Sequence, residues 1–584
     1  MANLPSHSTP QFSSLPRDVL AALSTLLVSM VWVPVASLAV LLLTGVTPFW
    51  NPALLCSTIF FFALAGLLFY HFPNRQKLWL ILGLLAFTLT AAVICLCFYD
   101  AGYDGRWYHA DAILALLNGF NPIHTSISGV ETVYANHYPK ATWYFAAFLI
   151  HFTHAYQLGK IYNLLLMLAS GLYAFDFFLR HRLYWRDAML LAAATALTPV
   201  AATQIVSYYV DGFFVALLTI TILAGVNLLI KPERCDRLLL ALTISLLVAT
   251  KFTGLVYAAV LIVLLLAART LISRHLPAAQ FWRVLSIDLA SATSALGFGL
   301  LVLGYTPYIT NLRQGLSLMY PVIGKDKIDF MSITTPPALL GHGYNAIEKF
   351  LISFFAPTQL SSGATIPFKI PFSVHWHEIV CFGDPGVNVA GWGVFFSGLV
   401  LSTLALFLVR RAWRRNAPFL LVLLLIAASG FINPESWKAR YSPQIGLLPV
   451  FFLAAVLCSK AKAQRWNGRL LTQMLCLTLI VNSLLCAGPA LAASCFKSKR
   501  LNQQFSLAIN KNGPGEYWIY RAAEVNVAKL HYEQFSGLRG VVLCGEITPR
   551  NQIPPGVGSP VWMNMRNETE ATLVKGSCSQ PPPY

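Results

Sequence analysis

The chain has 584 residues, of which 57% are hydrophobic and only 11% are charged. Soluble globular proteins carry about 25% charged residues, and a chain this apolar has too little polar surface to cover a soluble core. The composition therefore excludes an ordinary soluble protein, and the mean hydropathy of +0.62 indicates a membrane protein.

Apolar segments recur along the chain, and each full-length one can cross a hydrocarbon layer of roughly 30 Å as a helix. Two segments, 237–250 and 445–458, are shorter than a comfortable span. We predict an all-α polytopic membrane protein with about thirteen transmembrane helices in residues 20–488, after a tail (1–19) and before a C-terminal domain (489–584). The predicted spans are 20–44, 53–71, 78–98, 160–179, 187–203, 211–230, 237–250, 254–268, 284–305, 389–409, 417–432, 445–458 and 470–488.

Lysine and arginine gather in every second loop, a pattern that marks the cytoplasmic side. The short loops between them hold few cations, so most of the formal net charge of +18 reflects topology and nucleic acid is not an expected partner. We expect a bacterial inner-membrane protein with a cytoplasmic N-terminus. The segments expected outside are about 99–159, 306–388, 433–444 and 489–584. The basic loops contain Arg75, Lys77, Arg180, Arg182, Arg186, Lys231, Arg234, Arg237, Arg269, Arg274, Arg283, Arg410, Arg411, Arg414, Arg415, Lys460, Lys462, Arg465 and Arg469.

The first outside loop is the most informative stretch. Asp104-Gly105 has the pattern of a turn or helix N-cap, and the apolar spacing over 106–118 predicts an amphipathic helix along the membrane surface. A polar break at 137–140 precedes a second short amphipathic stretch, 141–154. For any single charged residue a solvated helix face or a cap is the simpler interpretation, but the concentration of carboxylates here favours a site.

Polar residues also mark other outer helix ends. Asp211 begins one span, and Lys251 separates two spans with almost no loop. A lysine this close to hydrocarbon is costly unless it snorkels or has a partner, so Lys251 either snorkels or binds an anion such as a lipid phosphate. In the cluster 433–441 the aromatic residues fit an interfacial belt, whereas Glu435 and Arg440 fit contacts to a charged headgroup.

Cysteines and histidines give weaker signals. Cys544 and Cys578 lie in the C-terminal segment, in a compartment expected to be oxidising, and we predict that they form a disulfide. His375 and His377 stand two residues apart, which fits a strand better than a helix, and neither a His-Glu-x-x-His motif nor a zinc-type cysteine spacing occurs. No motif supports a divalent metal, and no cofactor is predicted.

These features together resemble the GT-C superfamily of membrane glycosyltransferases, which includes protein mannosyltransferases, oligosaccharyltransferases and lipid A aminoarabinose transferases. The resemblance covers about residues 78–450. It rests on the many-span architecture, on the acidic first outside loop and on short motifs, none of which is stringent alone. The motifs are Asp104-Gly105-Arg106-x-Tyr108-His109, Asn121-Pro122-Ile123, Tyr138-Pro139-Lys140, Tyr209-Val210-Asp211-Gly212 and Glu435-x-Trp437-x-x-Arg440-Tyr441.

The resemblance implies an enzyme that moves a hexosyl or pentosyl group from a polyprenyl-phosphate donor to a glycan, lipid or protein acceptor. By position, Asp104 looks like the aspartate that acts as catalytic base or helps to activate the acceptor. Several relatives carry adjacent acidic pairs in this loop, whereas here glycine follows the aspartate, and two extra spans precede the loop. The subfamily and any metal dependence therefore stay open. The residues expected to bind substrate are Arg106, His109, Asp111, His137, Lys140, Asp211, Lys251, Glu435, Arg440 and Tyr441.

Two other classes of function compete with this interpretation. A transporter or flippase would use the charges at outer helix ends to gate a polar path, but charges deep inside the spans are scarce and no inverted repeat is evident. A structural or assembly protein would recruit partners through the C-terminal segment, where short apolar runs at 541–543 and 560–563 predict a small α+β domain. Covalent transfer of a labelled sugar distinguishes the enzyme from both alternatives.

Overall fold

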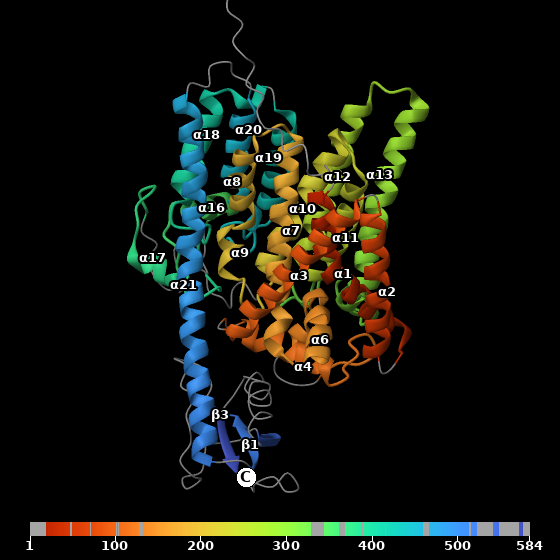
Figure 1. The fold of residues 1–584 in the computed structure, drawn as a ribbon, viewed down its shortest axis with the longest axis vertical. Helices are drawn as coiled ribbons and strands as arrows, with labels where there is room; N and C mark the ends of the chain where they lie inside the picture. Colours follow the sequence, from red (N-terminus) through yellow and green to blue (C-terminus); the bar gives the residue numbers. More distant parts are fainter. Residues whose placement is uncertain are drawn as a thin grey trace, which may run out of the picture.

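The computed structural model describes most of the chain between residues 19 and 575. In Figure 1 most helices run along the long axis of the molecule, and a small sheet lies beyond one end of them. The described residues are 19–46, 49–70, 72–100, 102, 104–127, 132–328, 344–360, 368–387, 389–414, 416–459, 466–512, 515–521, 541–547 and 571–575.

Eight helical segments in this part of the chain are long and apolar enough to cross a membrane, judged by length and composition. Seven of them contain α1 (Val19–Thr44), α2 (Trp50–Phe69), α3 (Asn74–Cys97), α7 (Tyr162–Arg180), α10 (Asp211–Ile230), α12 (Phe252–Ser273) and α13 (Ala278–Phe298), and the eighth, Arg469–Arg500, is part of α21 (Trp466–Asn512). The bundle also contains α8 (Trp185–Ala196), α9 (Pro199–Thr203), α11 (Arg234–Thr250), α18 (Phe396–Val409), α19 (Ala417–Phe431) and α20 (Leu448–Cys458). The chain is therefore a polytopic helical membrane protein.

Short helices and the sheet lie in the connecting segments. The helices are α4 (Ala110–Leu117, after the π-helical turn Gly105–His109), α5 (Thr132–His137), α6 (Ala141–Thr153), α14 (Thr310–Arg313), α16 (Ala346–Phe354) and α17 (Trp376–Cys381). The strands are β1 (Gly515–Arg521), β2 (Val541–Ile547) and β3 (Ala571–Lys575). Their order is β2–β1–β3, with β1 parallel to β2 and antiparallel to β3.

Helix α10 forms the centre of the bundle. Its most apolar stretch is 94% buried, and it packs against α7, α9, α11, α12 and α19. The corresponding stretches of α2, α3 and α13 are only 17%, 11% and 17% buried, and large apolar side chains such as Phe62 and Trp79 stand exposed on them. In water such a surface would promote association, whereas in a bilayer it is the face that contacts lipid. The first residue of α10, Asp211, is consequently placed in the middle of one end of the bundle.

Each predicted span overlaps a helix, although several boundaries were wrong. The span predicted at 187–203 is divided into α8 and α9 because Pro199 starts a new helix. The span predicted at 389–409 begins only at Phe396, after a loop whose backbone bonds to Asn482. The last predicted span is part of α21, which continues to Asn512. The number thirteen stays a prediction.

The loop helices differ more from expectation. The predicted helix 106–118 is present as a π-helical turn followed by α4, but it does not lie free on the membrane surface, because its apolar residues pack against α6. Helix α6, predicted as amphipathic, is buried on nearly every side. The strand-like spacing of His375 and His377 was misleading, since α17 begins directly after His375. In these segments, packing against other parts of the chain outweighed the local sequence pattern.

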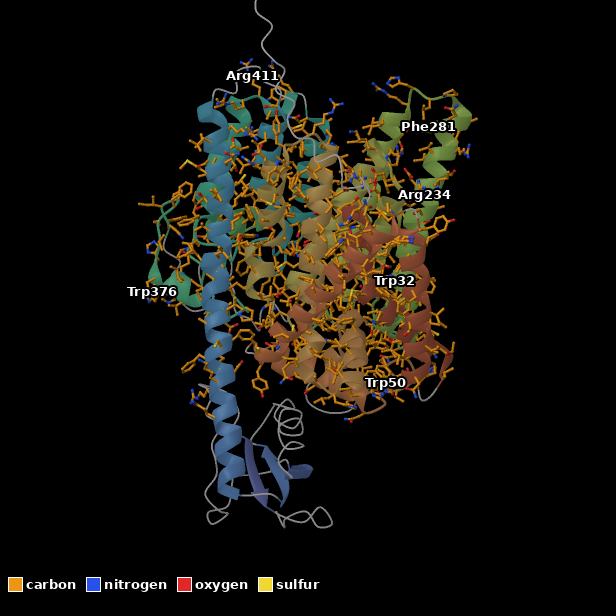
Figure 2. The ribbon with its side chains drawn as sticks, viewed as in Figure 1. Trp32, Trp50, Arg234, Phe281, Trp376 and Arg411 are labelled. Atoms are coloured by element: carbon orange, nitrogen blue, oxygen red, sulfur yellow. The ribbon has the colours of Figure 1, made fainter. Side chains whose placement is uncertain are left out.

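The two ends of the bundle differ in character. Figure 2 places Arg234 and Arg411, from two of the predicted basic loops, toward one end, and Trp50 at the other end, near the sheet. This separation agrees with the alternation of basic loops, while the assignment of that end to the cytoplasm stays a prediction. The predicted disulfide is not tested, because Cys578 and the side chain of Cys544 lie outside the described residues.

A buried ion cluster joins α7 to α11 at the basic end. The guanidinium of Arg180 lies 2.6 Å from Asp176, 2.7 Å from Glu233 and 2.9 Å from Asp236. Asp236 is fully buried and also accepts a hydrogen bond from Tyr173 Oη at 2.6 Å. Removing the guanidinium would leave carboxylates uncompensated in a low-dielectric environment, which is strongly destabilising.

We expect Arg180→Leu to lower the free energy of unfolding by about 3–5 kcal/mol, because it breaks this buried cluster. Thermal unfolding of the purified protein in detergent measures the effect. Arg234→Leu, which removes an exposed arginine at the same end, is the matched control and should leave the melting temperature nearly unchanged. Equal losses in the two variants would contradict a specific role for the cluster.

Candidate active site

The buried carboxylate of Asp211 is the centre of a polar cluster, with 1% of its side chain exposed. Its Oδ1 lies 2.5 Å from Nζ of Lys251, and its Oδ2 lies 3.0 Å from Nε of Arg440. Gln204 donates a hydrogen bond to Oδ2 at 3.0 Å and accepts one from the backbone N–H of Gly212 at 2.8 Å. The position at the N-terminus of α10 adds a favourable dipole interaction. The negative charge is thus compensated on several sides, as a buried carboxylate requires.

Arg440 connects Asp211 to the first outside loop. Its Nη2 lies 2.7 Å from Oδ2 of Asp104, while its Nε bonds to Asp211. The guanidinium also lies over the ring of Tyr209, at 4.6 Å from the centroid. Burial opposes the positive charge, but the two carboxylates outweigh burial and raise the pKa of Arg440 further above its usual value. Arg440 is therefore a permanent cation held between two aspartates.

Lys251 is the single residue between α11 and α12 and has an extended backbone (φ −154°, ψ 145°). The turn is so tight that a Cβ atom on Gly254 would meet a carbonyl oxygen of α11, so this approach requires glycine. The ammonium group points to Asp211 and donates to the carbonyl oxygen of Arg440 at 3.2 Å. It also lies 5.1 Å from the centroid of the Tyr441 ring. Lys251 therefore pairs with a carboxylate inside the protein and does not snorkel.

Asp104 is positioned by the backbone around it. The carboxylate of Asp100 accepts one hydrogen bond from a backbone N–H two residues later (2.8 Å) and another from the N–H of Tyr208 (2.7 Å). A Cβ atom on Gly105 would meet this carboxylate, so the loop closes in this way only with glycine there. The N–H of Asp104 then donates to Oη of Tyr209 at 3.3 Å. These bonds hold the loop of Asp104 against the segment that precedes α10.

His109, one of the residues expected to bind substrate, is buried and carries no positive charge at neutral pH. Its Nδ1 accepts a hydrogen bond from Nε1 of Trp143 at 2.6 Å, and only 4% of the residue is exposed. Burial lowers the pKa of His109 from 6.5 to about 3. The imidazole is therefore neutral at neutral pH, and its predicted contact with substrate stays a prediction.

Lys140 and His137 make structural contacts beside the cluster. The buried ammonium of Lys140 donates to the carbonyl oxygens of Asn136 (3.1 Å) and Tyr138 (2.8 Å), at the end of α5, and burial lowers its pKa well below the usual value. His137 bonds through Nδ1 to Asn311 Oδ1 at 2.7 Å and thereby joins the first outside loop to the second. Neither side chain contacts Asp104, Asp211, Lys251 or Arg440 in the structure.

The remaining predicted site residues are Tyr441, Glu435, Asp111 and Arg106. Tyr441 borders the cluster through its ring, and the pKa of its phenol is raised to about 12, chiefly by burial. Glu435 is partly exposed, and its carboxylate has no ion-pair partner among the described residues. Asp111 is half-buried on α4. The side chain of Arg106 lies outside the described residues.

Three contributors to the site are missing from the predicted site residues, although one of them, Tyr209, stands in a motif quoted for the family resemblance. Gln204 and Tyr209 contact Asp211 and Arg440, and their closeness in sequence to Asp211 was the available signal. The third contributor is the turn 384–386 of the second outside loop. A Cβ atom on Gly386 would lie 2.9 Å from Oη of Tyr209 and 3.7 Å from Nη1 of Arg440. No motif marked this turn, because only the fold brings it to the cluster.

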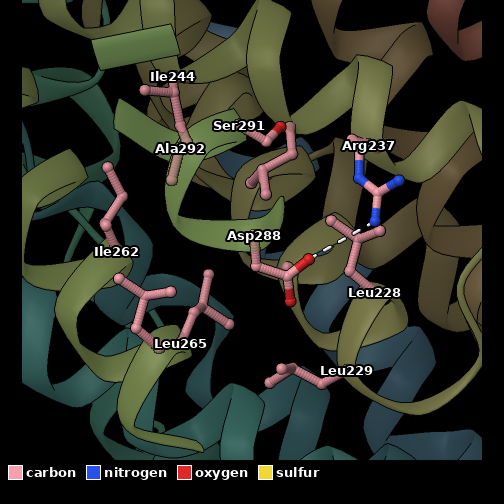
Figure 3. Close-up of a pocket in the computed structure, with 12 residues that line it drawn as sticks. Leu228, Leu229, Arg237, Ile244, Ile262, Leu265, Asp288, Ser291 and Ala292 are labelled. Carbon is pink, nitrogen blue, oxygen red and sulfur yellow. Dashed lines mark ion pairs between the residues drawn. The ribbon is translucent and has the colours of Figure 1, made fainter. Parts of the chain in front are cut away.

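Neither a metal site nor the apolar pocket of the bundle belongs to the polar cluster in the described part of the chain. Among the described residues no group of three His, Cys, Asp or Glu side chains could hold a metal ion. Figure 3 shows a pocket between α10, α11, α12 and α13, lined mainly by apolar side chains. Its one acidic lining residue, Asp288, pairs with Arg269 at 2.6 Å and Arg237 at 3.5 Å. The pocket lies near the C-terminal end of α10, far from Asp211, and is not part of the polar cluster.

The buried neutral state of His109 predicts a pH-dependent stability. Because its folded pKa of about 3 lies below the unfolded value of 6.5, the unfolded chain binds a proton first as the pH falls. The contribution of neutral His109 is complete above pH 6.5 and is lost progressively below it, by about 2 kcal/mol at pH 5. We expect the melting temperature to fall more steeply between pH 7.5 and 5 in the unmodified protein than in His109→Gln. Superimposable pH profiles would contradict this assignment.

Comparison with known proteins gives a structural likeness and no match in sequence. No protein-family model and no curated protein sequence matches the chain. Among solved structures, the chain is similar to the crystal structure of ArnT from Cupriavidus metallidurans bound to undecaprenyl phosphate. The TM-score is 0.47 at 11% sequence identity, and the match covers 86% of this chain and 99% of that chain. A likeness of this degree identifies neither family nor function, so the functional argument rests on the residues themselves.

Proposed function

We propose that the chain is a membrane glycosyltransferase that moves a sugar from a polyprenyl-phosphate donor to an extracytoplasmic acceptor. The sequence motifs that resemble the GT-C superfamily support this proposal. The observation that carries it is the convergence of Asp104, Asp211, Lys251 and Arg440 into one cluster, although Asp104 and Arg440 are 336 residues apart. A carboxylate beside two cations is the set of groups that this reaction needs.

The reaction exchanges two bonds at the anomeric carbon of the sugar. A bond forms from an acceptor oxygen or nitrogen to this carbon, and the bond from the carbon to a phosphate oxygen breaks. The acceptor proton goes to a base, and the electron pair of the broken bond stays on the polyprenyl phosphate. Asp104 is the proposed base. Its Oδ1 has no hydrogen-bond partner among the described residues and is available to an acceptor.

The departing phosphate gains negative charge, and the cations of the cluster would stabilise it. Nη1 of Arg440 has no hydrogen-bond acceptor in the described part of the chain, while Nε and Nη2 are held by the two aspartates. A phosphate oxygen could accept a hydrogen bond from Nη1, so that all three guanidinium nitrogens would then donate to an oxygen. Because Arg440 and Lys251 are only 18% and 19% exposed, they would act in a low-dielectric environment where such contacts are strong.

The proposed location follows from the direction of α10. Asp211 begins this helix, and Lys231 in a predicted cytoplasmic loop follows its other end. The cluster therefore lies at the end of α10 remote from that basic loop, and we propose that it faces the extracytoplasmic side of a bacterial inner membrane. The acceptor stays open between a glycan, a lipid and a protein, and the sugar between a hexose and a pentose.

We expect Asp104→Asn to reduce sugar transfer by roughly 10²- to 10⁴-fold, because an amide is unable to take the acceptor proton. The measurement is transfer of a radiolabelled sugar from a polyprenyl-phosphate donor to a membrane acceptor fraction. Asp326→Asn, which changes an exposed carboxylate in the second outside loop, is the matched control and should retain full activity.

Two results would overturn the assignment of Asp104. Normal transfer by a folded Asp104→Asn variant would exclude it as the base. Movement of a lipid-linked substrate across proteoliposomes without covalent change, unaffected by the same substitution, would favour a flippase. Binding of polyprenyl phosphate to the variant separates a loss of chemistry from a loss of donor binding.

We expect Arg440→Lys to raise the donor KM by roughly tenfold, because an ammonium group is unable to hold both aspartates and a phosphate oxygen in one plane. Steady-state kinetics with varied donor concentration measures this change. Arg313→Lys, which alters an exposed arginine on α14, is the matched control. An unchanged donor KM in Arg440→Lys would show that the guanidinium does not contact the donor phosphate.

A further inference from the structure

In the segment 368–380, between α16 and α18, the charged side chains are buried and several large apolar side chains are exposed. Its two charged residues, Lys369 and Glu378, are only 5% and 2% exposed. In contrast, the apolar side chains of Phe368, Ile370 and Trp376 are 75%, 77% and 76% exposed. A segment that faced water would show the opposite arrangement.

The buried charges satisfy each other inside the protein. The ammonium of Lys369 contacts the carboxylate of Glu378 and donates to the carbonyl oxygen of Val394 at 2.7 Å. Glu378 also accepts a hydrogen bond from the backbone N–H of Thr358 at 3.1 Å. The pair therefore needs no water, and the outer face of the segment consists of apolar side chains together with the exposed imidazoles of His375 and His377.

The following loop lies beside the membrane-spanning part of α21. At its start, a Cβ atom on Gly383 would lie 3.6 Å from Cβ of Ala493. At its end, Asn482 donates to the carbonyl oxygen of Trp392 at 3.0 Å and accepts from the N–H of Phe395 at 2.7 Å. Residues 470–496 of α21 contain no charged side chain, which is the character expected of a stretch at the depth of the hydrocarbon layer.

The surrounding sequence agrees with that depth. Residues 350–409 contain three charged side chains, Lys369, Glu378 and Asp384. The first two form the buried pair, and Asp384 precedes the turn that borders Tyr209 and Arg440. Irregular backbone at membrane depth is tolerated where its polar groups are buried in protein, as the bonds to Asn482 and Val394 show here. Figure 2 places Trp376 on the flank of the bundle, pointing away from it.

We infer that residues 368–380 form a membrane-inserted segment whose exposed apolar side chains contact the acyl chains of phospholipids. The segment lies in the leaflet on the same side as the polar cluster. This inference would place part of the segment expected outside, about 306–388, within the bilayer. This inference is independent of the proposed reaction, because it uses only the segment and its neighbours.

Site-directed spin labelling tests the inference. Nitroxide labels are attached to Ile370→Cys and, separately, to Trp376→Cys in phospholipid nanodiscs, and the spectrum of the unsubstituted protein is subtracted to remove labelled native thiols. Collision with oxygen, which concentrates in hydrocarbon, is compared with collision with a water-soluble nickel chelate. Lipid contact predicts that oxygen dominates severalfold at both positions. Two positions keep the test valid if one variant does not fold.

Two control positions calibrate the measurement. A label at Phe62→Cys, on the exposed face of α2, should show the lipid pattern, and a label at Lys325→Cys, exposed in the second outside loop, should show the water pattern. Dominant collision with the nickel chelate at positions 370 and 376 would overturn the inference. Exclusion of both reagents would also overturn it, since it would mean that protein covers the segment.

Discussion

The polar cluster is held together by the contacts that the guanidinium of Arg440 makes with two aspartates. The guanidinium bonds to Asp104 through Nη2 and to Asp211 through Nε, and so joins the first outside loop to the start of the central helix α10. Each of these charges would be costly alone so close to hydrocarbon. Together with Lys251 they form two cations and two carboxylates, and the charges balance. The fold therefore keeps reactive groups in place by making each one the partner of another.

Glycine makes this closeness possible in the backbone. At Gly105 and Gly254 a side chain would meet Asp100 or a carbonyl oxygen of α11, so both turns close only because no Cβ atom is present. The first turn places Asp104 beside Tyr209, and the second directs Lys251 toward Asp211. In these motifs the glycine beside the charged residue is thus required because no Cβ atom fits at its position. The spacing of the motif alone does not reveal this requirement.

The sequence predicted the membrane fold, the approximate spans and the four charged residues that converge, because hydropathy and isolated charges in an apolar chain are strong signals. It did not predict which charges pair. Burial of His109 depends on Trp143, and burial of Lys140 depends on carbonyl groups at the end of α5. These environments are made by packing between distant segments, as is the approach of the turn 384–386. The roles proposed for the residues of the cluster stay predictions.

The inserted segment gives the bilayer a direct mechanical connection to the cluster. Only three residues separate residue 380, where the segment ends, from Asp384, and the turn 384–386 borders both Tyr209 and Arg440. Lateral pressure and hydrophobic thickness act on any side chain that is embedded among acyl chains. A change in lipid composition would therefore reach the turn 384–386 through a few covalent bonds, and the guanidinium through its contact with this turn, without passing through the helical bundle. In this arrangement the bilayer would be mechanically coupled to the site at one point of its lining, the turn 384–386.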